Sequence, residues 1–81
     1  MLFRSSAANT AIARLTNREL DVLRELARGV TNREIGATLG MTEKTVMHHS
    51  GSIYAKLGVR GRAEAAATAI RSGLVDDASG R

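Results

Sequence analysis

The sequence predicts an all-α fold, a compact four-helix domain, and three observations support this. Four segments carry apolar residues at helical spacing, and a glycine follows each of them. Three of the four segments begin after a threonine in the position of an N-cap. No segment alternates polar and apolar residues with the period of two that is typical of a strand. With 81 residues, the chain has room for one domain.

The first expected helix runs over residues 17–28. Thr16 and Glu19 have the spacing of a capping box, in which each side chain satisfies a backbone N–H group of the other residue. Leu15 and Leu20 flank this box in the positions of a hydrophobic staple. The expected inward face consists of Leu20, Leu23, Leu26 and Ala27, with Val22 at its flank.

The same pattern repeats twice along the chain. Thr31 and Glu34 form a second capping box, which opens a short helix that extends to about Leu39. Thr42 is the N-cap of a third helix, expected over residues 43–57. The expected buried residues of these two helices are Ile35, Leu39, Val46, Ser50, Ile53 and Leu57.

A fourth helix, rich in alanine, is expected over about residues 62–72. Small side chains allow two helices to approach closely, and we hypothesise a symmetric homodimer through this helix. The expected dimer face consists of Ala63, Ala66, Ala67, Ile70 and Leu74. Arg62, at the start of the helix, is expected to support the fold or to lie near this face rather than to contact DNA.

The domain is expected to span residues 15–75. Residues 1–14 show no clear period and are interpreted as a linker or frayed N-terminal arm, and residues 76–81 as a flexible C-terminal tail. No apolar run approaches the roughly 18–20 residues that a membrane span requires, so no contact with a membrane is expected.

Composition excludes several classes of function. The chain contains no cysteine, so disulfides and thiolate metal sites are ruled out. It has no Ser–His–acid arrangement, no glycine-rich phosphate loop and no carboxylate pair in an apolar setting, so we do not expect an enzyme, a cofactor or a small-molecule ligand. His48 and His49 point about 100° apart on a helix, so we expect no metal site there. The net charge of +4 is compatible with a polyanionic partner.

Only Gly40, Met41 and Thr42 separate the second and third helices. A turn this short makes the helices cross steeply, which is the geometry of a helix-turn-helix. The longer third helix is then the recognition helix, because the major groove of DNA admits one helix. Its expected base-facing residues are Lys44, Met47, His48 and Gly51.

Phosphate contacts are expected at two places. The N-termini of the second and third helices present backbone N–H groups and a positive dipole end to an anion, and basic residues stand at the far end of the third helix. The expected phosphate-contacting residues are Thr31, Asn32, Arg33, Thr45, Lys56 and Arg60. An ordinary surface position without a DNA contact is the alternative for Thr45, Lys56 and Arg60, and also for the expected base-facing residues Met47 and His48.

Several runs of residues stand at a fixed spacing without a gap between Leu15 and about Leu74. They are Leu15-Thr16-Asn17-Arg18-Glu19, Val22-Leu23, Gly29, Thr31-Asn32-Arg33-Glu34-Ile35, Thr45-Val46, Ile53-Tyr54-Ala55-Lys56-Leu57-Gly58-Val59 and Arg62. Together they resemble the LuxR/NarL (GerE-type) DNA-binding domain of bacterial transcription regulators.

The resemblance implies sequence-specific binding of double-stranded DNA by the output domain of a larger regulator, with RNA polymerase as a further candidate partner. It also implies a third helix that reads DNA, a fourth helix used for dimerisation, and a location in the bacterial cytoplasm at the nucleoid. In this family the output domain usually follows a receiver, autoinducer-binding or nucleotide-binding domain.

The sequence departs from the family pattern on the third helix. Met47 stands where the family often has lysine, Gly51 replaces a residue that is often polar or basic, and Ser50 replaces an aliphatic residue on the inner face. The serine at position 50 buries less apolar surface than an aliphatic residue would, which lowers the stability of the fold by roughly 1.5–3 kcal/mol. The base-facing positions Met47, His48 and Gly51 thus lack long charged donors. The alternative function is therefore a helix-turn-helix fold that acts mainly as a protein-interaction or dimerisation module with weak DNA affinity.

Overall fold

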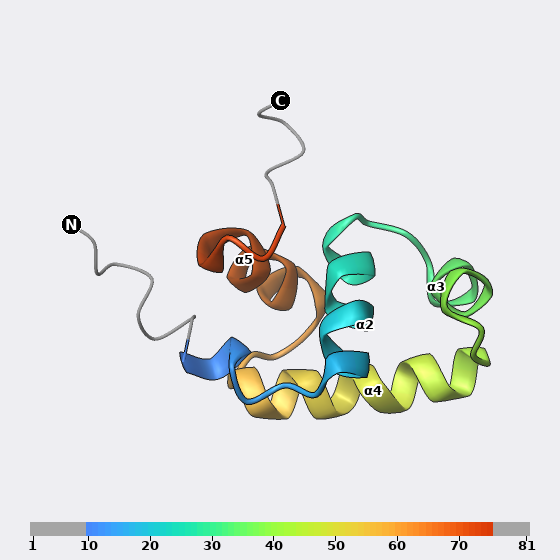
Figure 1. The fold of residues 1–81 in the computed structure, drawn as a ribbon, viewed down its shortest axis with the longest axis horizontal. Helices are drawn as coiled ribbons and strands as arrows, with labels where there is room; N and C mark the ends of the chain where they lie inside the picture. The colour runs from blue at the N-terminus through green and yellow to red at the C-terminus, as the bar shows by residue number, and fades with distance from the viewer. Residues whose placement is uncertain (1–9, 76–81) are drawn as a thin grey trace.

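The computed structural model describes residues 10–75 of the chain, and this part is helical without strands (Figure 1). A short helical segment at residues 10–12 precedes four longer helices. These are α2 (Asn17–Ala27), α3 (Asn32–Leu39), α4 (Glu43–Leu57) and α5 (Arg62–Ser72). The predicted all-α domain with its four helices is therefore confirmed.

Helix α2 is the centre of the domain, because it contacts each of the other three helices. Figure 1 shows α4 running along one edge of the molecule, with α2 standing on it, α5 on one side of α2 and α3 on the other. Helix α4 contacts α3 as well as α5. One long face of α4 is thus covered by the remaining helices.

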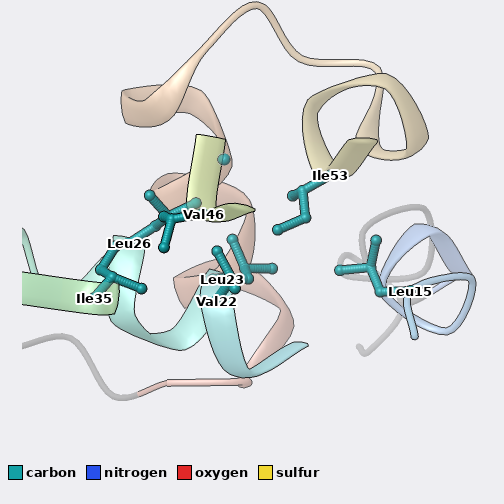
Figure 2. Packing of buried hydrophobic residues seen from close by; sticks show 9 residues of the cluster. Leu15, Val22, Leu23, Leu26, Ile35, Val46 and Ile53 are labelled. Carbon is teal, nitrogen blue, oxygen red and sulfur yellow. The ribbon is translucent and has the colours of Figure 1, made fainter. Parts of the chain in front are cut away.

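The core is aliphatic, and its side chains converge from α2, α3, α4 and α5 (Figure 2). Val22 was expected at the flank of the inward face of α2, but its side chain is fully buried. Leu20 and Ala27, which were expected on that face, are only partly buried. The reason is that α2 packs against neighbours on several sides, so its buried surface is wider than one stripe. The buried apolar residues are Leu15, Val22, Leu23, Leu26, Ile35, Val46, Ile53, Ala65 and Ala69.

The end of the segment predicted as an N-terminal arm is structured. The N–H of Arg14 donates to the carbonyl of Ala11 at 3.1 Å, and that of Leu15 to the carbonyl of Ile12 at 3.0 Å. Ile12 packs against the core. Residues 10–14 thus form a turn attached to the domain, and the rest of the predicted arm and tail lies outside the described residues.

The predicted capping boxes are present. The Thr16 N–H donates to Glu19 Oε1 at 2.8 Å, and the Thr31 N–H donates to Glu34 Oε1 at the same distance. Helix α5 begins differently, since its N-cap glycine carries no side-chain acceptor. There the Glu64 carboxylate accepts from the N–H of Arg60 at 2.9 Å.

The turn between α3 and α4 depends on two glycines. Gly40 adopts a left-handed conformation with φ 73° and ψ 37°, which a residue with a side chain rarely accepts. Gly36 is buried, and a Cβ atom added to it would overlap the carbonyl oxygen of Met41. The Met41 N–H also donates to the Gly36 carbonyl at 2.9 Å. Only a glycine at position 36 lets the turn lie this close to α3.

Membrane-spanning character is not found in the described residues, where no helix is both long and apolar enough to cross a bilayer.

Candidate nucleic-acid interface

One side of α4 is exposed along its length, and the other side is buried. Val46, Ser50 and Ile53 point into the domain. The four residues predicted to face bases are all exposed, and their spacing of three, four and seven residues places them on one side of the helix. We call these four residues, Lys44, Met47, His48 and Gly51, the α4 stripe.

The α4 stripe has no side chain at its Gly51 end and an apolar side chain, Met47, between Lys44 and His48. A Cβ atom added to Gly51 would have no neighbour within 4 Å, so this position is open to an approaching surface. Met47 is 60% exposed and is the one large hydrophobic residue of residues 10–75 that is exposed. Helix α4 therefore offers a shallow surface with one apolar side chain between polar ones.

The basic residues of the domain fall into two groups. On α2 they are paired with acids, since Arg18 and Arg24 each lie 3.4 Å from Asp21, and Arg28 lies 3.4 Å from Glu25. Around α3 and α4, three exposed cations have no acidic partner among the residues that the structure describes. These are Arg33, Lys44 and Arg60. Three cations that no acid of the described residues neutralises thus lie on or directly beside the helix-turn-helix, whereas Arg14, before α2, is a further exposed cation outside it.

Lys56 differs from these three cations, because its ammonium group is already engaged. Its Nζ atom donates to Glu19 Oε1 at 2.8 Å, and the Lys56 side chain is only 32% exposed. Ser52 donates to the other oxygen of Glu19 at 2.6 Å. The predicted phosphate contact of Lys56 would have to compete with this ion pair between α2 and α4.

The Glu19 carboxylate is nearly covered, with 6% of its side chain exposed. Burial by itself raises the pKa of this group, but the hydrogen bonds from Lys56, Ser52 and the Thr16 N–H outweigh burial and lower its pKa to about 2. Glu19 is therefore charged at neutral pH, and it links the start of α2 to the C-terminal part of α4.

The two helix N-termini predicted to bind phosphate are not equivalent. At α3, the Glu34 carboxylate occupies the cap, accepts from both the N–H and the hydroxyl of Thr31, and has its pKa lowered by these bonds. At α4, the corresponding residue is Thr45, whose hydroxyl accepts from Thr42 at 2.9 Å. A threonine hydroxyl rather than a carboxylate thus stands at this cap, which leaves the N-terminus of α4 more open to an anion than that of α3.

The predicted dimer face is partly used inside the domain. Ala63 is exposed, whereas Ala66, Ala67, Ile70 and Leu74 are half-buried, and Leu74 packs against the core. Arg62 lies next to this face, and its Nη2 atom is buried without a hydrogen-bond partner. These positions leave a modest apolar surface on α5.

The two histidines lie beside each other with ring centroids 6.3 Å apart in an edge arrangement. His48 is exposed and His49 is half-buried. Within residues 10–75 there is no group of three or more histidine, aspartate or glutamate residues that could hold a metal ion.

Sequence reasoning missed three positions that hold the helix-turn-helix in place. They are Gly36 in the turn, Ser52 beside Glu19, and Arg18, whose Nη2 atom donates to the Leu39 carbonyl at 2.8 Å. Arg18 thereby caps the C-terminus of α3 from α2. No local pattern marks these contacts, because the partners of Ser52 and Arg18 lie 33 and 21 residues away in the chain.

The steep α3–α4 pair joined by a three-residue turn, with one side of α4 exposed, defines a helix-turn-helix domain of the kind that presents a helix to DNA. The chain belongs to the family described as bacterial regulatory proteins, luxR family, whose sequence model matches residues 13–69. The predicted resemblance is thereby confirmed.

Similar proteins carry names of transcription regulators. The transcriptional regulatory protein LnrK of Bacillus subtilis is 47% identical over 60 residues, which cover 74% of this chain and 27% of the relative. The nitrate/nitrite response regulator protein NarP of Escherichia coli is 49% identical over 51 residues, which cover 63% of this chain and 24% of the relative. The transcriptional regulatory protein LiaR of B. subtilis is 48% identical over 62 residues, which cover 76% and 29%.

The chain thus spans about a quarter of the length of these curated relatives. No solved structure matched it. The family description and the names of the relatives denote regulators rather than enzymes, in agreement with the sequence-based expectation.

Proposed function

We propose that this chain is the output domain of a bacterial transcription regulator and binds specific sites in double-stranded DNA with α4 in the major groove. The observation that carries the proposal is the exposed α4 stripe, Lys44, Met47, His48 and Gly51, flanked by cations that no acid of the described residues neutralises. Membership of the luxR family supports the same assignment.

The main phosphate contacts are proposed to come from exposed side chains that have no acidic partner among the described residues. Arg33 at the start of α3 and Arg60 after the end of α4 extend from the two ends of the helix-turn-helix. Thr45 is exposed and offers its hydroxyl group at the N-terminus of α4. Thr31 and Lys56 contribute less, because Thr31 is bound in its capping box and Lys56 is bound to Glu19. Asn32 is half-buried at the start of α3 and is proposed as a further, weaker contact. Such contacts position the helix without specifying the sequence.

The test is fluorescence anisotropy with a random-sequence duplex of about 25 base pairs, titrated across salt concentrations. The variants are Arg33→Gln, Arg60→Gln and Arg28→Gln, which all lower the net charge by the same amount. Arg28 is the control because it stands at the end of α2 that points away from α4 (Figure 1), where its side chain is 66% exposed and paired with Glu25.

We expect affinity to fall steeply with salt, and each of Arg33→Gln and Arg60→Gln to reduce the logarithmic salt slope by about 0.9. Arg28→Gln should leave the slope unchanged. Equal losses in all three variants would show an effect of net charge alone, and a folded chain that binds no duplex at low salt would refute the proposal.

A homodimer through α5 is proposed as the form that binds DNA. A two-fold symmetric pair would place two copies of α4 on successive major grooves, about one helical turn apart. Light scattering after size-exclusion chromatography, with and without DNA, tests this. A chain that stays monomeric even on its DNA would contradict it.

The second candidate function is a protein-interaction module, and the α4 stripe favours it because Met47 and Gly51 offer no polar side-chain group to DNA. Charge reversal separates the two functions. Arg33→Glu combined with Arg60→Glu should abolish DNA binding under the first function and leave binding to a protein partner largely intact under the second. Lys56→Glu is unsuitable for this test, because it would also break the ion pair with Glu19.

A further inference from the structure

Met47 is distinguished by its position as well as by its exposure. Other large apolar side chains of residues 10–75 are at least partly covered, whereas this one stands 60% exposed in the middle of the α4 stripe. A single exposed apolar residue is ordinary on a protein surface. Here it lies on the helix face proposed to enter DNA, so its chemistry has a direct consequence for which bases that face accepts.

The residues beside Met47 set how DNA can meet it. Lys44 lies three residues before it and Gly51 four residues after it on the same side of α4. From Lys44 to Gly51 the helix rises about 10 Å, at roughly 1.5 Å per residue. This length covers about three base pairs, so Met47 would lie over the central part of such a triplet.

The major groove presents polar acceptors and donors and one apolar group, the C5-methyl of thymine. The Met47 thioether side chain has no hydrogen to donate and is only a weak acceptor, so it gains little from a guanine or cytosine edge. It is unbranched and flexible, so it can settle against a methyl group. The absence of a side chain at Gly51 removes a barrier to close approach of the helix.

We propose that Met47 is a specificity-determining residue that contacts the C5-methyl group of a thymine in the recognition site. This inference rests on the proposed function. Lys44, an exposed donor with no acidic partner among the described residues, would contact the acceptors of a guanine within about three base pairs of that thymine. The preferred site therefore pairs a thymine with a nearby guanine under each copy of α4.

The test begins with selection of a preferred site from a random duplex pool, using the chain as it stands. Each thymine of the selected site is then replaced singly by uracil, which removes the methyl group and keeps every hydrogen-bonding atom. The dissociation constants are measured for the wild type, Met47→Ala and Met47→Leu. Circular dichroism checks that all three are folded, which the exposure of residue 47 favours.

We expect uracil at one thymine of each half-site to weaken wild-type binding about fourfold, which corresponds to about 0.8 kcal/mol for one buried methyl group. Met47→Ala should bind the thymine and uracil duplexes alike, and Met47→Leu should keep the discrimination because it stays apolar.

Two results would overturn the inference and leave the proposed function standing. One is salt-dependent binding to a preferred site with no thymine-to-uracil effect at any position of that site. The other is the same effect in Met47→Ala as in the wild type, since the methyl group would then act through the DNA itself. Failure to bind any duplex, or binding without any preferred site, would instead refute the proposed function and the inference with it.

Discussion

At the scale of single residues, Glu19 shows how one side chain can serve two levels of structure. It closes the capping box of α2 and also holds Ser52 and Lys56 of α4. A nearly covered carboxylate is costly unless it is paired, and here each oxygen accepts a short hydrogen bond. The orientation of α4 against α2 therefore depends on a residue that the sequence presents only as a cap.

The Glu19→Gln variant should be less stable than the wild type by about 2–3 kcal/mol at neutral pH, allowing for solvent screening of the partly exposed Lys56. The folded-state pKa of about 2 lies below the ordinary value of 4.5, so this stabilisation is fully present above 4.5 and is lost as pH falls from 4.5 towards 2. Urea unfolding of both proteins at several pH values measures it.

At about pH 3 the difference between wild type and Glu19→Gln should shrink to less than half. Glu43→Gln is the control, at an exposed carboxylate in the first turn of α4; it should cost less than about 1 kcal/mol, the usual contribution of an acid near a helix N-terminus. If the difference in unfolding free energy between the wild type and Glu19→Gln did not depend on pH, the role of Glu19 would rest on its packing and not on its charge.

Two glycines in helices should respond to alanine in opposite ways. Gly36→Ala forces a Cβ atom against the Met41 carbonyl, and we expect a loss of about 1–3 kcal/mol. Gly51→Ala meets open space inside α4, so it should gain about 0.5–1 kcal/mol from helix propensity. Thermal unfolding compares the two variants, and equal effects would contradict the close packing of the turn.

At the scale of elements, α4 carries two serines with different roles. Ser50 is buried, and its hydroxyl donates to the Val46 carbonyl one turn earlier in the same helix at 2.9 Å. The polar group on the inner face is therefore satisfied locally, as serine often is within a helix. Ser52 instead donates to Glu19 on α2. The hydrogen bond of Ser50 thus stays within α4, whereas that of Ser52 connects α4 to α2.

Ser50→Ala should be neutral or stabilising by up to about 0.5 kcal/mol, because alanine favours the helix and the Val46 carbonyl keeps its backbone position. Ser52→Ala should cost about 1–2 kcal/mol, since it removes a hydrogen bond to a charged group. Chemical denaturation of the two variants provides the comparison. A larger loss for Ser50→Ala than for Ser52→Ala would contradict these roles.

At the scale of the whole molecule, the described part has one small aliphatic core around α2. A domain of this size has little stability in reserve. Leu23 is fully buried in the centre of that core, whereas Leu20 on the same helix is only partly buried. Stability is thus concentrated in few side chains, while the DNA-facing side of α4 contributes little to it.

Leu23→Ala should cost about 2–5 kcal/mol, enough to leave much of the chain unfolded at room temperature. Leu20→Ala should cost clearly less, and Met47→Ala almost nothing. Thermal melts followed by circular dichroism rank the three. If Met47→Ala destabilised the domain as much as Leu20→Ala, Met47 would belong to the core and not to the interface.

The helices, their caps and the exposed stripe of α4 were predictable from the sequence, because each depends on residues within one or two turns of each other. The Thr16–Glu19 and Thr31–Glu34 boxes are of this kind. The short turn before α4 predicted that this helix meets DNA, the family resemblance implied the same, and family membership is now shown.

The pairing of Lys56 with Glu19, the full burial of Val22 and the requirement for glycine at position 36 were decided by tertiary structure. Helical periodicity states which side of a helix is apolar, but not which neighbour covers it or how closely. Lys56 and Glu19 are 37 residues apart, and their distance depends on how α4 crosses α2. Local patterns therefore specify the elements, whereas the packing of those elements decides which of the basic residues stay free for DNA.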